Sequence, residues 1–240
     1  MASVYLAEDV VLEEAEVAIK ILSDLGEAMP EHRARFLQEV KLTRKIQHQN
    51  VVRTFDYGQD GDLSFYSMEY LRGVPLSELM ARGTPDFQTC LSIATQLMRG
   101  VVAIHGVGVI HRDLKPSNII VGEAGLVTIT DFGIARGESS SVTLNPSQVL
   151  GTIAYIAPEV LSGNRASRAV DFYALGVVLY ELLTGYLPFD EESPARLILQ
   201  KVEQEPISIS VHRGDLPEWL EGVTDFHIRA GRARGRPVFG

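Results

Sequence analysis

The hydrophobic pattern of this 240-residue chain changes its period once, and this change limits the fold more than any other feature. Before about residue 86, short runs of valine, isoleucine and aromatic residues alternate with Gly, Asp and Glu clusters, which is typical of strands. We predict strands at residues 3–7, 17–22, 51–57 and 63–70. One helix is expected among them, because Pro30 and Glu31 suit a first turn and apolar residues from Phe36 to Ile46 recur at roughly helical spacing.

From residue 87 onward the spacing is helical. Apolar residues from Phe87 to His105 fall on one stripe of a long helix, which Gly106 and Gly108 are suited to end. Residues 168–184 predict a second helix, apolar on nearly every side, as at the centre of a lobe. Residues 118–121 and 126–130 predict a small hairpin between these helices. The pattern therefore predicts an α+β fold, with a small antiparallel sheet and one helix before a larger, mainly helical part.

Composition excludes several classes of function. The chain has 22 Lys and Arg against 31 Asp and Glu, a net charge of −9, which argues against general binding of nucleic acid. Cys90 is the only cysteine, so neither an intrachain disulfide nor a zinc cluster built on cysteines can form. No apolar run reaches the about 20 residues that cross a bilayer, and the N-terminal residues lack a signal-peptide pattern. We expect a cytoplasmic protein with no membrane segment in this chain.

The most specific motif is His-Arg-Asp-Leu-Lys-Pro-Ser-Asn at residues 111–118, followed after the predicted hairpin by Asp131-Phe132-Gly133. Val-Ala-Ile-Lys precedes it at 17–20, and Ala-Pro-Glu follows it at 157–159. In this order and spacing, the motifs resemble those of eukaryotic-type serine/threonine protein kinases. Their amino-acid sequences are similar to those of the bacterial members of this family. The resemblance covers about residues 1–223. It implies a two-lobed fold, with an N-lobe at 1–70 and a C-lobe at 71–224, followed by an atypical basic tail at 225–240.

The resemblance implies a role in phosphoryl transfer for four side chains. Lys20 would hold the α- and β-phosphates of ATP, and Glu39 would fix the lysine by an ion pair. Asp113 would orient the substrate hydroxyl and accept its proton, while Lys115 would reach the γ-phosphate. Because the transition state is loose and strongly anionic, positioning and charge neutralisation suit this reaction. Two of these residues also have an ordinary structural interpretation: Lys20 as a solvated strand end, and Glu39 as part of a solvated helix face.

The resemblance also implies the binding site for ATP and its metal ion. Apolar contacts and backbone hydrogen bonds suit a flat heteroaromatic base. Asparagine and aspartate supply the oxygen ligands that Mg²⁺ prefers, with Mn²⁺ as the alternative ion. The implied nucleotide-binding residues are Lys20, Val4, Ala18, Met68, Glu69, Leu71, Asn118 and Asp131, of which Asn118 and Asp131 would hold the metal. Val4 and Ala18 could instead only pack the sheet, and Asp171, which holds the catalytic loop in the family, could only cap its helix.

Residues 134–156 correspond to the activation segment in this resemblance. Arg112 is the natural partner for a phosphate there, because a guanidinium binds phosphate in a bidentate way. Gly151 and Thr152 would shape the floor on which a protein substrate rests. The alternative is a flexible polar loop without regulation. The candidate phosphorylation sites are Ser139, Ser140, Ser141, Thr143 and Ser147.

The chain departs from the family pattern at both ends. The third glycine position of the family's glycine-rich loop falls on Ala2, so most of that loop would lie before Met1. After Val223 no amphipathic helix is evident, and residues 229–240 hold four arginines and no acid. We therefore expect a domain truncated at both ends, or a frame-shifted product, in which Glu159 lacks its arginine partner and is costly if buried.

The sequence thus predicts a kinase that transfers the γ-phosphate of ATP to serine and threonine hydroxyls of proteins. The expected partners are ATP and protein substrates, with a kinase–kinase dimer for autophosphorylation, and not nucleic acid. The main alternative is an inactive nucleotide-binding or interaction module, or a non-functional fragment, because the scaffold is incomplete. A small-molecule phosphotransferase with the same fold is a second alternative, disfavoured by the Ala-Pro-Glu motif and the long activation segment.

Overall fold

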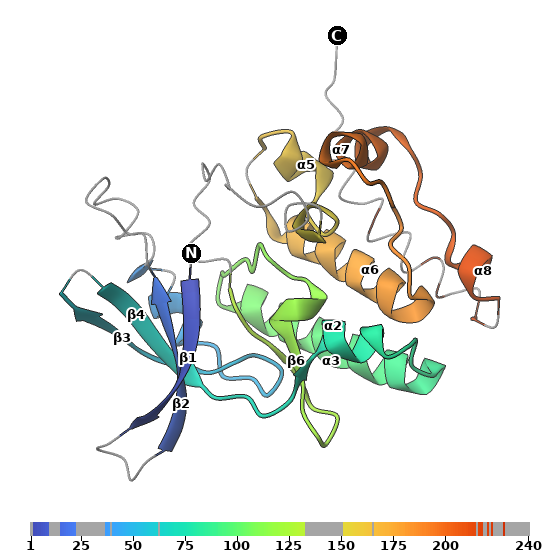
Figure 1. Cartoon of the computed structure of the whole chain (residues 1–240). Helices are drawn as coiled ribbons and strands as arrows, with labels where there is room; N and C mark the ends of the chain where they lie inside the picture. The colour runs from blue at the N-terminus through green and yellow to red at the C-terminus, as the bar shows by residue number, and fades with distance from the viewer. Residues whose placement is uncertain are drawn as a thin grey trace.

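The structure is a computed structural model. It describes residues 2–9, 15–22, 37–38, 40–61, 63–132, 151–164, 166–214, 216–217, 220, 222 and 228. A twisted sheet occupies one side of the molecule and a group of helices the other, with a short hairpin between them (Figure 1). The two-part α+β architecture predicted from the change in periodicity is therefore confirmed.

The sheet of the smaller lobe is antiparallel throughout. Its spatial order is β1-β2-β4-β3, formed by β1 (Ala2–Asp9), β2 (Ala15–Leu22), β3 (Thr54–Asp60) and β4 (Leu63–Glu69). Lys20 on β2 lies opposite Val4 on β1 and Tyr66 on β4. Since directly opposed residues share a face of an antiparallel pair, these three side chains lie on one face of the sheet. The predicted helix is confirmed in part, because residues 37–38 and 40–43 are helical; its predicted start lies outside the described residues.

The third strand begins later than predicted, because residues 50–52 pair with the other lobe. Val51 forms an isolated parallel bridge with Ile129, and the Val52 N–H donates to the Ile129 carbonyl at 2.9 Å. Asn50 donates its side-chain amide to the Val127 carbonyl at 2.7 Å, and its own carbonyl accepts from the Ile129 N–H at 3.0 Å. These bonds fasten the sheet lobe to the hairpin of the helical lobe.

The helical lobe is arranged around two long helices that the sequence predicted. They are α3 (Phe87–Gly106), capped by the Asp86 side chain, and α6 (Arg168–Thr184), which begins after Ser167 and ends at Gly185 with φ 78°. The other helices were not predicted and are short or amphipathic. They are α2 (Leu76–Ala81), α5 (Pro158–Leu161), α7 (Pro194–Glu203) and α8 (Ile209–His212).

The predicted hairpin belongs to the helical lobe and is the part that pairs with residues 50–52. A single 3-10 turn, η1 (Pro116–Asn118), leads into β6 (Ile119–Val121), which pairs with β7 (Val127–Ile129) and with the two-residue strand β5 (Val74–Pro75). Ile119 and Ile129 face each other across the hairpin and are fully buried. The hairpin thereby fixes the positions of the residues directly before and after it.

Helix α3 is long and apolar enough to satisfy a simple test for a membrane span, and it is the only helix of the described part that does so. In the structure it packs against α6 and β7, and its Leu97 and Ile104 side chains are fully buried. Its apolar stripe is therefore accounted for by the core. Ile228, which lies in the segment predicted as a tail, is also fully buried and belongs to the same hydrophobic cluster.

Candidate active site

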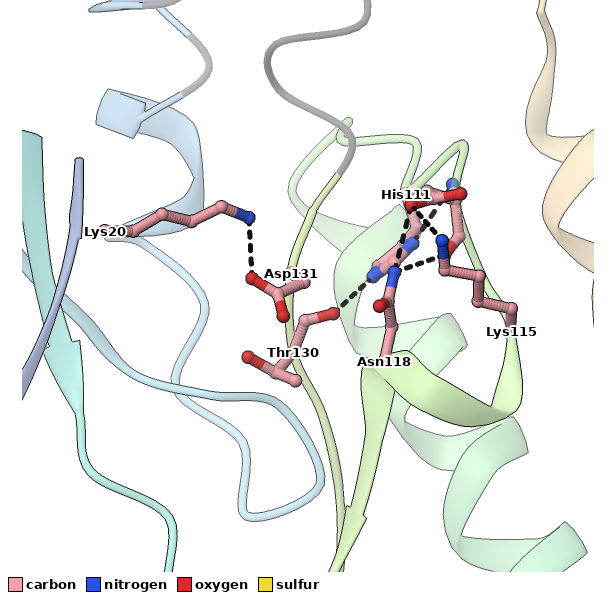
Figure 2. A network of polar contacts seen from close by, with 7 residues as sticks. Lys20, His111, Lys115, Asn118, Thr130 and Asp131 are labelled. Carbon is pink, nitrogen blue, oxygen red and sulfur yellow. Dashed lines mark hydrogen bonds and ion pairs between the residues drawn. The ribbon is translucent and has the colours of Figure 1, made fainter. Parts of the chain in front are cut away.

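Lys20 of the sheet lobe meets Asp131 at the end of the hairpin. The Lys20 ammonium lies 2.6 Å from Asp131 Oδ1, and the two side chains are 14% and 28% exposed (Figure 2). Desolvation acts to lower the pKa of Lys20, but interactions with Tyr66 and Asp131 outweigh it, so the pKa is raised above its ordinary value. Lys20 is therefore held as a cation facing the helical lobe.

The hairpin register places Asn118 beside the residues that lead into Asp131. The Thr130 N–H donates to the Asn118 carbonyl at 2.9 Å, one step beyond the Ile119–Ile129 pair. Asp131 follows directly, with φ 58°, a left-handed conformation that non-glycine residues rarely adopt. Such strain is typical of functional sites, where the surrounding structure enforces it. The hairpin thus brings an amide and a carboxylate from its two strand ends together.

Asp113, Lys115 and Asn118 interact within one short loop. Asn118 donates its side-chain amide to the Asp113 carbonyl at 2.8 Å and to Asp113 Oδ2 at 3.1 Å. The Lys115 ammonium lies 3.2 Å from the same Oδ2, with the two side chains 20% and 15% exposed. Since the Asn118 nitrogen is used in these bonds, its Oδ1 is the atom that can face a cation.

The loop is held from beneath by Asp171 of α6. One carboxylate oxygen accepts from the His111 N–H at 2.8 Å and contacts His105 Nε2 at 2.7 Å; the other accepts from the Arg112 N–H at 2.8 Å. Arg112 has φ 65°, a strained conformation that these bonds stabilise. Asp171 is 1% exposed and does more than cap its helix, because it fixes the backbone directly before Asp113.

His111 joins the same loop to the hairpin. Its Nδ1 accepts from the Asp113 N–H at 3.3 Å, so Nε2 carries the proton and donates to the Thr130 carbonyl at 3.0 Å (Figure 2). Desolvation lowers the pKa of this fully buried ring, which favours the neutral tautomer that the two bonds require. The ring therefore fixes the spacing between Asp113 and Asp131.

Val4, Ala18 and Met68, which are predicted to surround the adenine, lie on the same face of the sheet as Lys20, whereas Glu69 ends β4. Ala18 lies opposite Met68 in the β2–β4 pair, and both are buried, whereas Val4 is 50% exposed. The Glu69 N–H donates to the Arg53 carbonyl at 2.9 Å, so Glu69 can offer a base only its carbonyl. Leu71 lies two residues further on, in the connection toward β5.

Some predicted residues lie outside the described part of the chain. Glu39 is one of them, and so are Gly133 and all the candidate phosphorylation sites, Ser139, Ser140, Ser141, Thr143 and Ser147. Glu159 is expected to lack an arginine partner, which stays a prediction because residues 229–240 lie outside the described residues. Its carboxyl is 5% exposed and interacts electrostatically with the Lys201 ammonium of α7.

Two residues near the site were missed from the sequence. Tyr66 lies opposite Lys20 and influences its charge; its position two residues before Met68 on the same strand was the available signal. Lys201 lies four residues after the buried Leu197, so helical spacing places both on the apolar face of α7. A lysine on such a face indicates a buried partner.

A sheet lysine paired with an aspartate at a hairpin end, next to an Asp–Asn pair in the preceding loop, defines the site of a protein kinase-like domain. Comparison with known families agrees, since the model of the protein kinase domain matches residues 1–224. The chain belongs to the protein kinase domain family. Family members use ATP and a divalent metal ion.

Curated relatives are bacterial serine/threonine-protein kinases. PrkC of Bacillus subtilis is 38% identical over 224 residues, which is 93% of this chain and 34% of the relative. A probable serine/threonine-protein kinase of Bifidobacterium longum, pknA2, is 35% identical over 246 residues, covering 100% of this chain and 32% of the relative. The chain spans about a third of the length of these relatives. The crystal structure of the Mycobacterium tuberculosis PknI kinase domain superposes with a TM-score of 0.74 at 24% identity, covering 99% of this chain and 86% of that one.

Proposed function

We propose that this chain is a serine/threonine protein kinase, which transfers the γ-phosphate of ATP to hydroxyl groups of proteins. One observation supports this most directly: Asp131 contacts Lys20 of the sheet, while Asn118, across the hairpin, contacts Asp113. Phosphoryl transfer requires cationic groups for the phosphates and a carboxylate for the hydroxyl, close together in fixed positions. The relatives named above support the serine/threonine specificity.

The nucleotide would lie against the face of the sheet that carries Lys20. Val4 and Ala18 would cover the adenine, with Met68 behind it and the Glu69 carbonyl and the Leu71 backbone bonding its edge. Lys20, kept charged by its surroundings, would bind the α- and β-phosphates. Glu39 is proposed to pair with Lys20 when the site is assembled.

Asn118 and Asp131 would hold the divalent ion, for which we propose Mg²⁺, with Mn²⁺ as the substitute. The residues fit such an ion, because both offer hard oxygen ligands: Asn118 Oδ1 is a neutral amide oxygen, and Asp131 is an anionic carboxylate. Phosphate oxygens and water would complete the coordination of such an ion. Such an ion neutralises negative charge on the phosphates.

Asp113 is proposed to orient the substrate hydroxyl and accept its proton. Its Oδ2 is already fixed by Asn118 and by the Lys115 ammonium, which would turn toward the γ-phosphate when substrate binds. Arg112 would bind a phosphate added to the activation segment, at one of the five hydroxyl residues predicted above.

The N-lobe is taken as residues 1–70, the C-lobe as 71–224 and the tail as 225–240. We place the protein in the cytoplasm, with protein substrates that carry serine or threonine, and propose a kinase–kinase dimer for autophosphorylation.

The function is tested by separating binding from transfer. The thermal shift of the chain with Mg-ATP measures binding. Transfer is measured as radiolabelled phosphate incorporated into two acceptors, which are dephosphorylated casein and the Asp113→Asn chain. The wild-type chain should show both, and the Asp113→Asn variant should keep the thermal shift while losing about 10³-fold in transfer. Binding without Asp113-dependent transfer would instead identify an inactive nucleotide-binding module.

A further inference from the structure

Lys201 of α7 is a buried cation outside the site described above. It has no exposed surface, and among the described residues it is the only buried lysine or arginine. Lysine is almost never fully buried unless it is paired, because desolvating an ammonium is costly. Its position therefore requires specific partners.

The partners are the backbone carbonyls of one short segment. The Lys201 ammonium donates to the carbonyls of Ile153, Ala154 and Ile156, each at 2.7 Å. An ammonium has three N–H donors and no acceptor, so the three carbonyls use its full capacity. One side chain thus fixes residues 153–156 at a single point.

The charge of Lys201 is balanced by two neighbouring elements. Glu159 of α5 contributes a favourable electrostatic interaction, and the Tyr173 ring of α6 has its centroid 5.0 Å from the ammonium. Desolvation lowers the pKa of Lys201 to about 7, and Glu159 acts in the opposite direction. The ammonium form is the one that can serve all three carbonyls.

The same segment is also held by its own side chain. The Tyr155 hydroxyl donates to the Glu181 carboxylate of α6, while the carbonyls of Ala154 and Ile156 on either side of it accept from Lys201 of α7. Figure 1 shows α5 and α7 lying next to each other above α6. Residues 153–156 are therefore held by α6 and α7, and every contact described for Lys201 is to this segment, α5 or α6.

We propose that Lys201 is a positioning residue for the protein substrate, because it fixes the backbone of residues 153–156 from beneath. The inference rests on the proposed function, in which the residues before Ala-Pro-Glu form the floor for a protein substrate. It assigns Lys201 to binding of the acceptor protein and not to binding of ATP.

The test compares Lys201→Met with Arg196→Met. Both substitutions remove one cation from α7, but Arg196 is exposed. At pH 6.5, below the pKa of about 7 at which Lys201 loses its proton, Lys201→Met should raise the KM for the protein acceptor about ten-fold, since three charge-assisted hydrogen bonds are lost, and leave the KM for ATP unchanged. Amide hydrogen exchange at residues 152–157 should also become faster than in wild type. Arg196→Met should change none of these quantities.

Two outcomes would overturn the inference: unchanged acceptor KM and exchange in a folded Lys201→Met protein, or equal changes in both KM values. If Lys201→Met fails to give the Mg-ATP thermal shift, Lys201→Arg takes its place. It keeps the charge, but its planar fork cannot direct three donors from one atom, so the same changes are expected. If the wild-type chain phosphorylates neither acceptor, the proposed function fails, while hydrogen exchange still decides whether Lys201 holds the segment.

Discussion

Lys20 and Asp131 are 111 residues apart in sequence and 2.6 Å apart in the structure. One belongs to the central part of the sheet and the other follows the hairpin, so their ion pair is a direct contact between the two lobes. Both side chains remain partly exposed, which leaves them accessible to a ligand between the lobes. The ion pair therefore joins the two lobes at the site and leaves a cation accessible to a phosphate group.

Replacing Lys20 should impair transfer much more than stability. Lys20→Met removes the cation proposed to bind the phosphates, so kcat/KM for ATP should fall by about 10²–10³-fold. Lys20→Arg should recover little of this loss, because a planar guanidinium does not replace a compact ammonium. Steady-state kinetics at varied ATP concentration measure the effect. If Lys20→Met keeps the kcat/KM for ATP of the wild type, the lysine is a solvated strand end with no role in binding phosphate.

Replacing Asp171 should affect both folding and transfer. The Asp171→Asn amide cannot replace a carboxylate that accepts from the His111 and Arg112 N–H groups and contacts His105. We expect a loss of about 2–3 kcal/mol in the free energy of unfolding, measured by denaturant titration, together with reduced transfer. The exposed Glu203→Gln should alter neither. A fully stable but inactive Asp171→Asn protein would contradict a structural role for the carboxylate.

Gly100 is predicted to be intolerant of a side chain. A Cβ there would lie 2.8 Å from the Asn50 carbonyl oxygen and 2.8 Å from the Ile129 side chain. Gly100→Ala should therefore separate α3 from the lobe junction and lower the free energy of unfolding by about 1–3 kcal/mol. Gly106→Ala, at the end of the same helix in open space, should be close to neutral. Equal thermal midpoints for the two variants would argue against tight packing at Gly100.

Lys201 should give the stability a specific dependence on pH. The unfolded chain holds this proton up to its ordinary pKa of 10.5, whereas the folded chain releases it near pH 7. Between these values the unfolded state binds the extra proton, so the free energy of unfolding should rise with pH, by at most about 1.4 kcal/mol per pH unit. Denaturant titrations of wild type and Lys201→Met from pH 6.5 to 9 measure the difference. A difference independent of pH would show that Lys201 keeps its proton throughout.

The two long helices, the four strands and the hairpin could be predicted because their apolar residues repeat regularly over many positions. Asp113, Asn118 and Asp131 could be singled out because they stand in motifs that resemble those of protein kinases. Lys201 could not, since its partners are backbone carbonyls, which leave no signature in a sequence. The late start of β3 was also missed, because Val51 and Val52 suit a strand equally well whichever sheet they join.

The bonds of residues 50–52 to β7 bear on how this chain can be divided experimentally. A cut near residue 70 follows the order of the sequence but separates hydrogen-bonded partners, so each half would expose backbone groups that the other half satisfies. Fragments for complementation or split-reporter work should therefore keep residues 46–52 with the hairpin, or supply them in trans as a peptide.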